Sequence, residues 1–116
     1  MNPKSGMIIA AILGVVCTMT AINATASIRS QRIEIQQLII EEAARQHFPA
    51  ELALAVAKVE SNFNARARSS AGAMGVMQIM PKTAEEELHV SRYNLYDPEV
   101  NVRAGIRFLK HLIATY

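Results

Sequence analysis

Apolar residues recur at intervals of three and four along most of the chain, and the alternation of apolar and polar residues that marks strands is not seen. Recurrence at three and four is typical of helices that bury one face, whereas a half-buried strand repeats every second residue. The pattern therefore predicts an all-α domain over residues 27–116, preceded by a leading segment of different character.

Four helices are expected in this domain, with a Met-rich segment at residues 73–80 before the third. Prolines near three of the helix starts suit a first turn, because the N–H that proline lacks would have no partner there. The clearest start is at Asp97, Pro98 and Glu99, which supply a capping carboxylate, a first-turn proline and a first-turn acid. The expected ranges are roughly 30–46, 49–61, 82–88 and 97–116.

Residues 1–26 have the layout of a secretory signal peptide. Lys4 precedes an apolar run at 7–22, and Ala-Thr-Ala follows at 24–26. A basic start, a short apolar stretch and an Ala-x-Ala site are the marks of such a peptide. We expect cleavage after Ala26 and export to the periplasm, with membrane contact only before cleavage. An uncleaved anchor is the alternative, although a spanning helix usually needs about 20 predominantly apolar residues.

Charge and cysteine content narrow the classes of function. The 12 basic and 10 acidic residues nearly balance, and no basic stripe interleaved with aromatic residues indicates a nucleic-acid partner. The only cysteine, Cys17, lies in the leading segment, which excludes a disulfide, a thiolate zinc site or a cysteine nucleophile from the domain. The histidines do not have the spacing of metal ligands, so no metal or cofactor is expected. They are His47, His89 and His111.

Glu60 is the most informative single position. It follows Val56 by four residues and Leu52 by eight, so it projects from the apolar stripe of the second helix. A carboxyl on such a stripe loses water, which favours its protonated form and lets it donate a proton to a leaving oxygen. From periodicity alone, however, a glutamate at a helix end that reaches round to water is the commoner arrangement.

Three stretches of sequence resemble the soluble lytic transglycosylases, whose fold is like goose-type lysozyme. Glu-Ser stands at residues 60–61, and Gly-Val-Met-Gln at 75–78 matches a Gly-x-Met-Gln motif. The third stretch, residues 95–102 with Gly105, matches the segment that leads into the next helix of the family. The resemblance spans about residues 50–112 and implies a lysozyme-like transglycosylase domain that acts on peptidoglycan glycan strands.

The resemblance also implies a role for each site residue. Glu60 would protonate the glycosidic oxygen of the β-1,4 bond between N-acetylmuramic acid and N-acetylglucosamine. It would then accept the proton of the muramoyl 6-hydroxyl, which gives a 1,6-anhydro end without water. One carboxylate suffices for this reaction, whereas glycoside hydrolysis usually needs two. Ser61 would form a hydrogen bond near the carboxylate or the substrate, and Met77 and Gln78 would line the sugar-binding cleft.

Complete members of the family continue past the last helix with an Ala-Tyr-Asn-Ala-Gly segment that closes the cleft. We therefore expect an incomplete domain whose last helix exposes Ile106, Leu109 and Ile113, an apolar face that favours a partner.

Two functions stay open. One is a minimal lytic transglycosylase of the periplasm that serves a secretion or conjugation apparatus or a phage. The other is a non-catalytic remnant or an accessory wall-binding protein of such a system.

Overall fold

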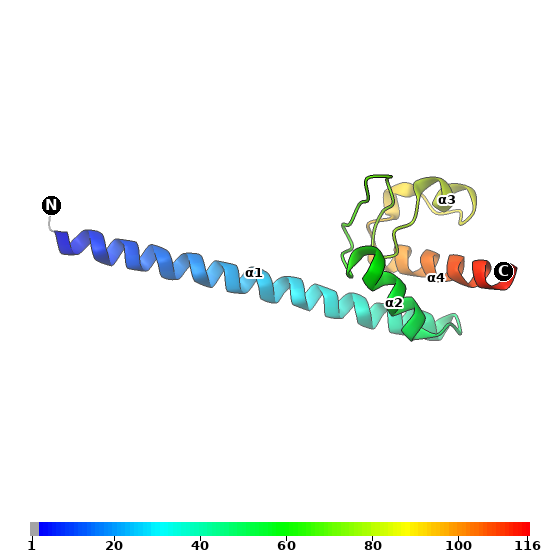
Figure 1. Ribbon diagram of the computed structural model, residues 1–116, viewed down its shortest axis with the longest axis horizontal. Coiled ribbons are helices and arrows are strands. Elements are labelled where there is room, and N and C mark those ends of the chain that lie inside the picture. Colours follow the sequence, from blue (N-terminus) through cyan, green and yellow to red (C-terminus); the bar gives the residue numbers. More distant parts are fainter. Residues whose placement is uncertain (1–2) are drawn as a thin grey trace. The chain divides into compact units, whose positions relative to one another are not determined.

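The computed structural model describes the backbone of residues 3–116 and the side chains of residues 14–116. The chain divides into two compact units, Met1–Gln31 and Arg32–Tyr116. Helices dominate the described residues and no strand is present among them, which confirms the predicted all-α class (Figure 1). The second unit contains every predicted site residue, so the account below concerns this unit.

Helix α1 (Pro3–Arg45) is continuous and begins far before the expected start near residue 30. Between these two points only Gly6 and Gly14 strongly disfavour a helix interior, and each glycine costs only about 1 kcal/mol. The predicted signal peptide, residues 1–26, falls partly outside the residues whose side chains are described. Among the described residues, no helix contains an apolar stretch of the length that a bilayer crossing requires.

The core of the second unit is formed where the last turns of α1 meet α2 (Ala50–Ser61), α3 (Pro81–Glu86) and α4 (Pro98–Thr115). Small side chains on α2 and α3 allow the helices to approach closely, and branched side chains on α1 and α4 fill the space between them. The buried helical members are Ile35, Ile39, Ala43, Ala53, Ala57, Ala84, Val102 and Ile106.

The start of α4 is as predicted from the sequence. The Asp97 carboxylate accepts the backbone N–H groups of Glu99 at 2.9 Å and Val100 at 3.4 Å, which caps the helix. The expectation that the last helix exposes three apolar residues is only partly correct. Ile106 is fully buried because it faces the core, whereas Ile113, near the end of α4, is 58% exposed.

Other helix boundaries differ from expectation by one or two residues. Pro49 is the extended N-cap of α2 rather than part of its first turn. Helix α2 ends at Ser61 and is followed by Asn62, whose left-handed conformation is typical of the residue that caps a helix C-terminus. Helix α3 begins at Pro81 and ends before Leu88, and a short 3₁₀ helix, η1 (Arg92–Asn94), follows it. The Met-rich segment is not helical, and Met74 forms isolated antiparallel bridges with Arg68 and Ile79.

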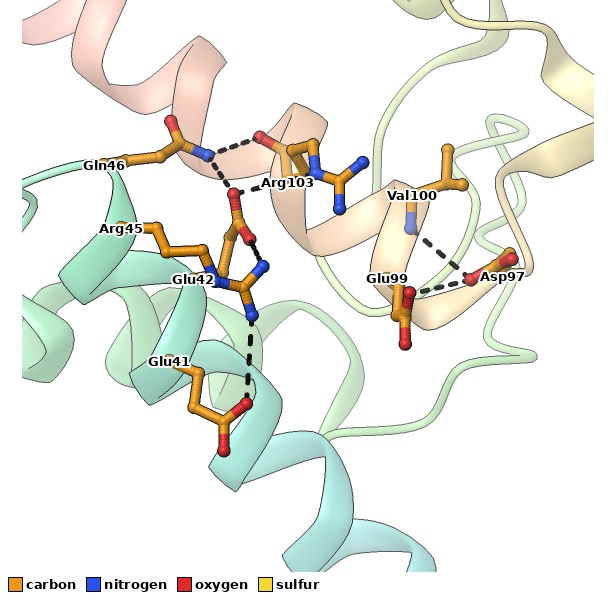
Figure 2. A network of polar contacts seen from close by, with 8 residues as sticks. All are labelled: Glu41, Glu42, Arg45, Gln46, Asp97, Glu99, Val100 and Arg103. Atoms are coloured by element: carbon orange, nitrogen blue, oxygen red, sulfur yellow. Dashed lines mark hydrogen bonds and ion pairs between the residues drawn. The ribbon is translucent and has the colours of Figure 1, made fainter.

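A polar network joins α1 to α4 around Glu42, which is only 5% exposed (Figure 2). Its carboxylate accepts hydrogen bonds from Arg45 Nη1 at 2.8 Å and Gln46 Nε2 at 2.9 Å, and it lies 3.8 Å from Arg103 Nε. Gln46 Nε2 also donates to the Arg103 carbonyl at 3.0 Å, and Lys110 Nζ donates to the Gln46 carbonyl at 2.6 Å. This buried carboxylate is therefore satisfied by groups from both helices.

Candidate active site

A groove with a volume of about 250 Å³ lies between α2, the segment before α3, and α4. It brings together three of the four predicted site residues, Glu60, Met77 and Gln78. The rest of its lining is largely apolar, and Glu60 is the only titratable side chain among the described residues that line it. The other lining residues are Val56, Ile79, Met80, Thr83, Gly105, Phe108, Leu109 and Leu112.

Glu60 stands in the last turn of α2 and is exposed, so the expectation that its apolar stripe buries it is wrong. The stripe that α2 turns toward the core consists of Ala53 and Ala57, one position further along the helix. The stripe of Leu52, Val56 and Glu60 is rotated about 100° around the helix axis from the buried alanine stripe. Val56 and Glu60 line the groove, and the side chain of Leu52 is 41% exposed to solvent. Glu60 is therefore open to a ligand that enters the groove.

The floor of the groove follows a turn that only glycine permits. Gly75 has φ +79°, and a Cβ at this position would collide with Asn101 Nδ2 and the Leu95 carbonyl. The same kind of close approach occurs at Gly105 of α4, where a Cβ would lie 2.6 Å from Met77 Cγ. Both glycines of the matched stretches thus allow the segment that carries Met77 and Gln78 to pack directly on α4.

Asn101 of α4 holds this segment in place. It is fully buried, and its Oδ1 accepts the Met77 backbone N–H at 2.7 Å. Its Nδ2 donates to the carbonyls of Met74 and Leu95, both at 2.9 Å. The partners are one N–H and two carbonyls, so the orientation of the amide follows from the hydrogen bonds themselves. Asn101 is a site-organising residue to which the sequence analysis gave no role.

Gln78 has a left-handed backbone, φ +51°, and its side chain is tied to its own loop. Its Nε2 donates to the Ala67 carbonyl at 3.1 Å and to the Gly75 carbonyl at 2.9 Å. Both donors of the amide are therefore used, and Oε1 has no hydrogen-bond donor among the residues that the structure describes. Toward a ligand in the groove, Gln78 can accept a hydrogen bond but has no free N–H to donate.

Ser61 does not line the groove. Its Oγ lies 2.7 Å from the Val76 carbonyl and 3.2 Å from that of Ala57, and the shorter distance favours donation of its single proton to Val76. The same oxygen accepts the Asn64 backbone N–H at 3.3 Å. Ser61 therefore joins the end of α2 to the segment before Met77, and it supports the site from behind rather than from within the groove.

The groove can bind an uncharged, partly apolar chain and present one carboxyl to it. Glu60 lines the groove and can donate or accept a proton, and Gln78, which also lines it, can accept a hydrogen bond through Oε1. Among the described residues, no three His, Cys, Asp or Glu side chains gather in a way that could hold a metal ion.

A family model described as Transglycosylase SLT domain matches residues 37–116. Two proteins named membrane-bound lytic murein transglycosylase C, from Yersinia pestis and Yersinia pseudotuberculosis, are each 37% identical to this chain over 87 residues. These alignments cover 68% of this chain and 24% of each relative, so the chain spans about a quarter of the length of the curated relatives it matches.

Solved structures give the same match. An inactive mutant of the lytic transglycosylase Slt from Pseudomonas aeruginosa superposes with a TM-score of 0.62 at 30% identity. The 70 kDa soluble lytic transglycosylase SLT70 from Escherichia coli also gives 0.62, at 31% identity. Each superposition covers 68% of this chain and 14% of the other.

Proposed function

Because the chain belongs to the transglycosylase SLT domain family, we propose that it is a peptidoglycan lytic transglycosylase in which Glu60 is the catalytic acid and base. The observation that carries the proposal is the groove that contains Glu60, Met77 and Gln78 with no second carboxylate among its described lining residues. Hydrolysis of a glycoside usually requires two carboxyl groups, one on each side of the bond. Intramolecular transfer to a hydroxyl of the same sugar requires only one carboxyl group.

In the proposed reaction, protonated Glu60 donates its proton to the glycosidic oxygen between N-acetylmuramic acid and N-acetylglucosamine. The bond between this oxygen and C1 of the muramoyl sugar breaks, and N-acetylglucosamine leaves with a free 4-hydroxyl. The carboxylate then accepts the proton of the muramoyl 6-hydroxyl while the 6-oxygen bonds to C1. The product is a 1,6-anhydro end, no water is consumed, and Glu60 returns to its protonated form.

The open position of Glu60 is compatible with this role. A glycan strand in the groove would exclude water from the carboxyl, and loss of water favours the protonated form that the first step requires. The apolar walls at Val56, Phe108 and Leu112 would face the carbon surfaces of the sugar rings. Gln78 Oε1 would accept an N–H or O–H of the bound sugars, which matches the acetamido N–H that both sugars carry.

The test is the chemical nature of the glycan ends. Purified sacculi are incubated with the protein, and the released muropeptides are analysed by liquid chromatography and mass spectrometry. We expect muropeptides with 1,6-anhydro ends, each lighter by one water than the corresponding reducing end. Release of reducing ends alone would contradict the proposal, because it would show hydrolysis.

A second candidate function is wall binding without cleavage, and the observation that favours it is the exposure of Glu60. Among the described residues, no side chain forms a hydrogen bond or an ion pair with Glu60 to position it. Under this alternative the protein would sediment with sacculi but release no muropeptides.

We also propose that residues 1–26 direct export, which would place the enzyme in the periplasm with its substrate. Cleavage after Ala26 would leave Ser27 as the first residue of the mature chain. Intact-mass measurement on protein recovered from the periplasm tests this, and a mass that includes Met1 would show an uncleaved segment instead. Service to a secretion or conjugation apparatus stays a prediction of the sequence analysis.

A further inference from the structure

The side of helix α2 that points away from the core is apolar. Leu52, Ala55 and Val59 follow one another at intervals of three and four residues, which places them on one face of the helix. This outer face lies roughly opposite the buried residues Ala53 and Ala57. All three of its residues are exposed, and Val59, at 85%, is the most exposed large aliphatic side chain that the structure describes. Exposed apolar side chains grouped in this way are typical of a contact with another protein.

Two opposite charges flank the outer face along one of its edges. Glu51 and Lys58 are seven residues apart, so both project from the same side of the helix, about 10 Å apart along its axis. Both side chains are exposed, and neither forms an ion pair with the other or with any further residue that the structure describes. The outer face therefore presents an acid near its first turn and a base near its last turn, and both are available to a partner.

We propose that the outer face binds the outer face of a second copy of this chain, with the two α2 helices antiparallel. A two-fold axis beside Ala55 then puts Leu52 of each copy opposite Val59 of the other, and the small side chain of Ala55 lets the helices approach closely. The axis also puts Glu51 of each copy next to Lys58 of the other, because it reverses their order along the helix. The outer face is thus complementary to itself in shape and in charge, as a two-fold interface requires.

The pairing leaves the groove free. Val56 and Glu60, which line the groove, lie along the edge of the outer face away from Glu51 and Lys58. The two-fold axis keeps these edges of both helices on the same side of the pair, so the two grooves lie beside the contact rather than within it. Each copy can therefore bind a ligand without the other, and the inference stands independently of the proposed function.

The contact is small, so the association should be weak. Helix α2 has 12 residues and is therefore about 18 Å long, and one face of it offers only a few hundred Å². Stable interfaces bury about 1,200–2,000 Å² in total, whereas transient ones bury less. We expect a dissociation constant between about 10 µM and 1 mM. Sedimentation equilibrium of the full chain over this range should show the weight-average mass rising from 12.7 kDa toward twice that value.

Charge reversals test the antiparallel pairing itself. Glu51→Lys and Lys58→Glu should each raise the dissociation constant roughly 10-fold, because each replaces two attractive pairs with two repulsive ones. The double variant restores opposite charges and should return to within about 3-fold of the parent. It also carries both charges that the helix dipole disfavours, so its recovery would not come from a more stable helix. Glu87→Lys changes the net charge as much as Glu51→Lys at an exposed position outside α2, and this matched control should leave the association unchanged.

Val59→Ser tests the apolar part of the contact. Because Val59 is exposed, its loss should leave the melting temperature unchanged while it weakens the association at least about 5-fold. A parent that keeps the mass of a single chain up to about 1 mM would overturn the inference. Association that Glu51→Lys and Val59→Ser leave unchanged would also overturn it, because the contact would then lie elsewhere in the chain. An effect of Lys58→Glu without one of Glu51→Lys would rule out the antiparallel arrangement.

Discussion

Asn101 Oδ1 accepts the backbone N–H of Met77 at 2.7 Å, so a buried side chain of α4 sets the position of the segment that forms the floor of the groove. The same amide also holds the carbonyls of Met74 and Leu95. Helix α4 thus both lines the groove and holds the segment of Met77, which lines the groove together with Glu60. Changes at Asn101 should affect the fold and the site together.

Replacement of Asn101 by leucine should destabilise the second unit strongly. Leucine has a similar shape but leaves the buried Met77 N–H and the Leu95 carbonyl without the partner that Asn101 supplies, at about 1–3 kcal/mol for each, whereas the Met74 carbonyl keeps its hydrogen bond from the Ile79 N–H. We expect the free energy of unfolding to fall by about 2 kcal/mol or more, measured by urea unfolding followed by circular dichroism. Asn94→Leu, at an exposed position of η1, is the control and should change stability by less than about 0.5 kcal/mol. Similar stability of the two variants would contradict the role given to Asn101.

The two left-handed glycines of the 62–80 connection allow a paired test of the close packing on α4. At Gly72, φ is +98° and a Cβ would meet nothing within 4 Å, so Gly72→Ala should cost about 1–2 kcal/mol of backbone strain alone. At Gly75 the same strain is joined by collisions with Asn101 and Leu95, so Gly75→Ala should cost at least about 2 kcal/mol more. Equal melting temperatures for the two variants would contradict this packing.

The neighbouring acids Glu41 and Glu42 should differ sharply in their effect on stability (Figure 2). Glu42 is buried and receives hydrogen bonds from Arg45 and Gln46, so Glu42→Ala should cost about 2 kcal/mol. Glu41 lies 3.8 Å from Arg45 with both side chains more than half exposed, so Glu41→Ala should change stability by less than about 0.5 kcal/mol. Differential scanning calorimetry of both variants measures the difference. A larger loss for Glu41→Ala would show that the network does not join α1 to α4 as described.

The ion pair of Glu85 and Arg92 predicts a small pH effect of known sign. Hydrogen bonds from the Arg92 side chain, at 2.8 Å to each carboxylate oxygen, hold the pKa of Glu85 below its ordinary value of 4.5. A lowered pKa means that this pair stabilises the fold above pH 4.5 and that the contribution is lost as the pH falls through the folded-state pKa. In an NMR titration of side-chain carboxyls, Arg92→Met should move the pKa of Glu85 back up toward 4.5. An unchanged titration curve would rule out the pair in solution.

Features set by near neighbours in the sequence were predictable. The cap at Asp97 acts on residues two and three positions away, and the proline and acid that follow it mark the start of α4 in any context. The fold class also follows from local periodicity, and the matched stretches at 60–61 and 75–78 located three of the residues that line the groove.

Features set by distant contacts were not predictable in this way. Two of the partners of Asn101 lie 24 and 27 residues before it, so nothing in its immediate neighbours indicates a buried amide that organises the site. The exposure of Glu60 was missed because α2 has two apolar stripes, and periodicity does not say which one faces the core. The small residues Ala53 and Ala57 indicate which stripe faces the core, because small side chains let other helices approach closely.

Glu60→Gln tests the central claim most directly, since the amide has nearly the same shape but can neither donate the catalytic proton nor accept one. Release of anhydro-muropeptides from purified sacculi should fall roughly 100- to 10,000-fold. The unfolding free energy should stay within about 0.5 kcal/mol, because the side chain is exposed. Glu51→Gln, an exposed acid in the first turn of the same helix, should release muropeptides at the parental rate. Parental release by Glu60→Gln would contradict the assignment of Glu60 as the catalytic acid and base.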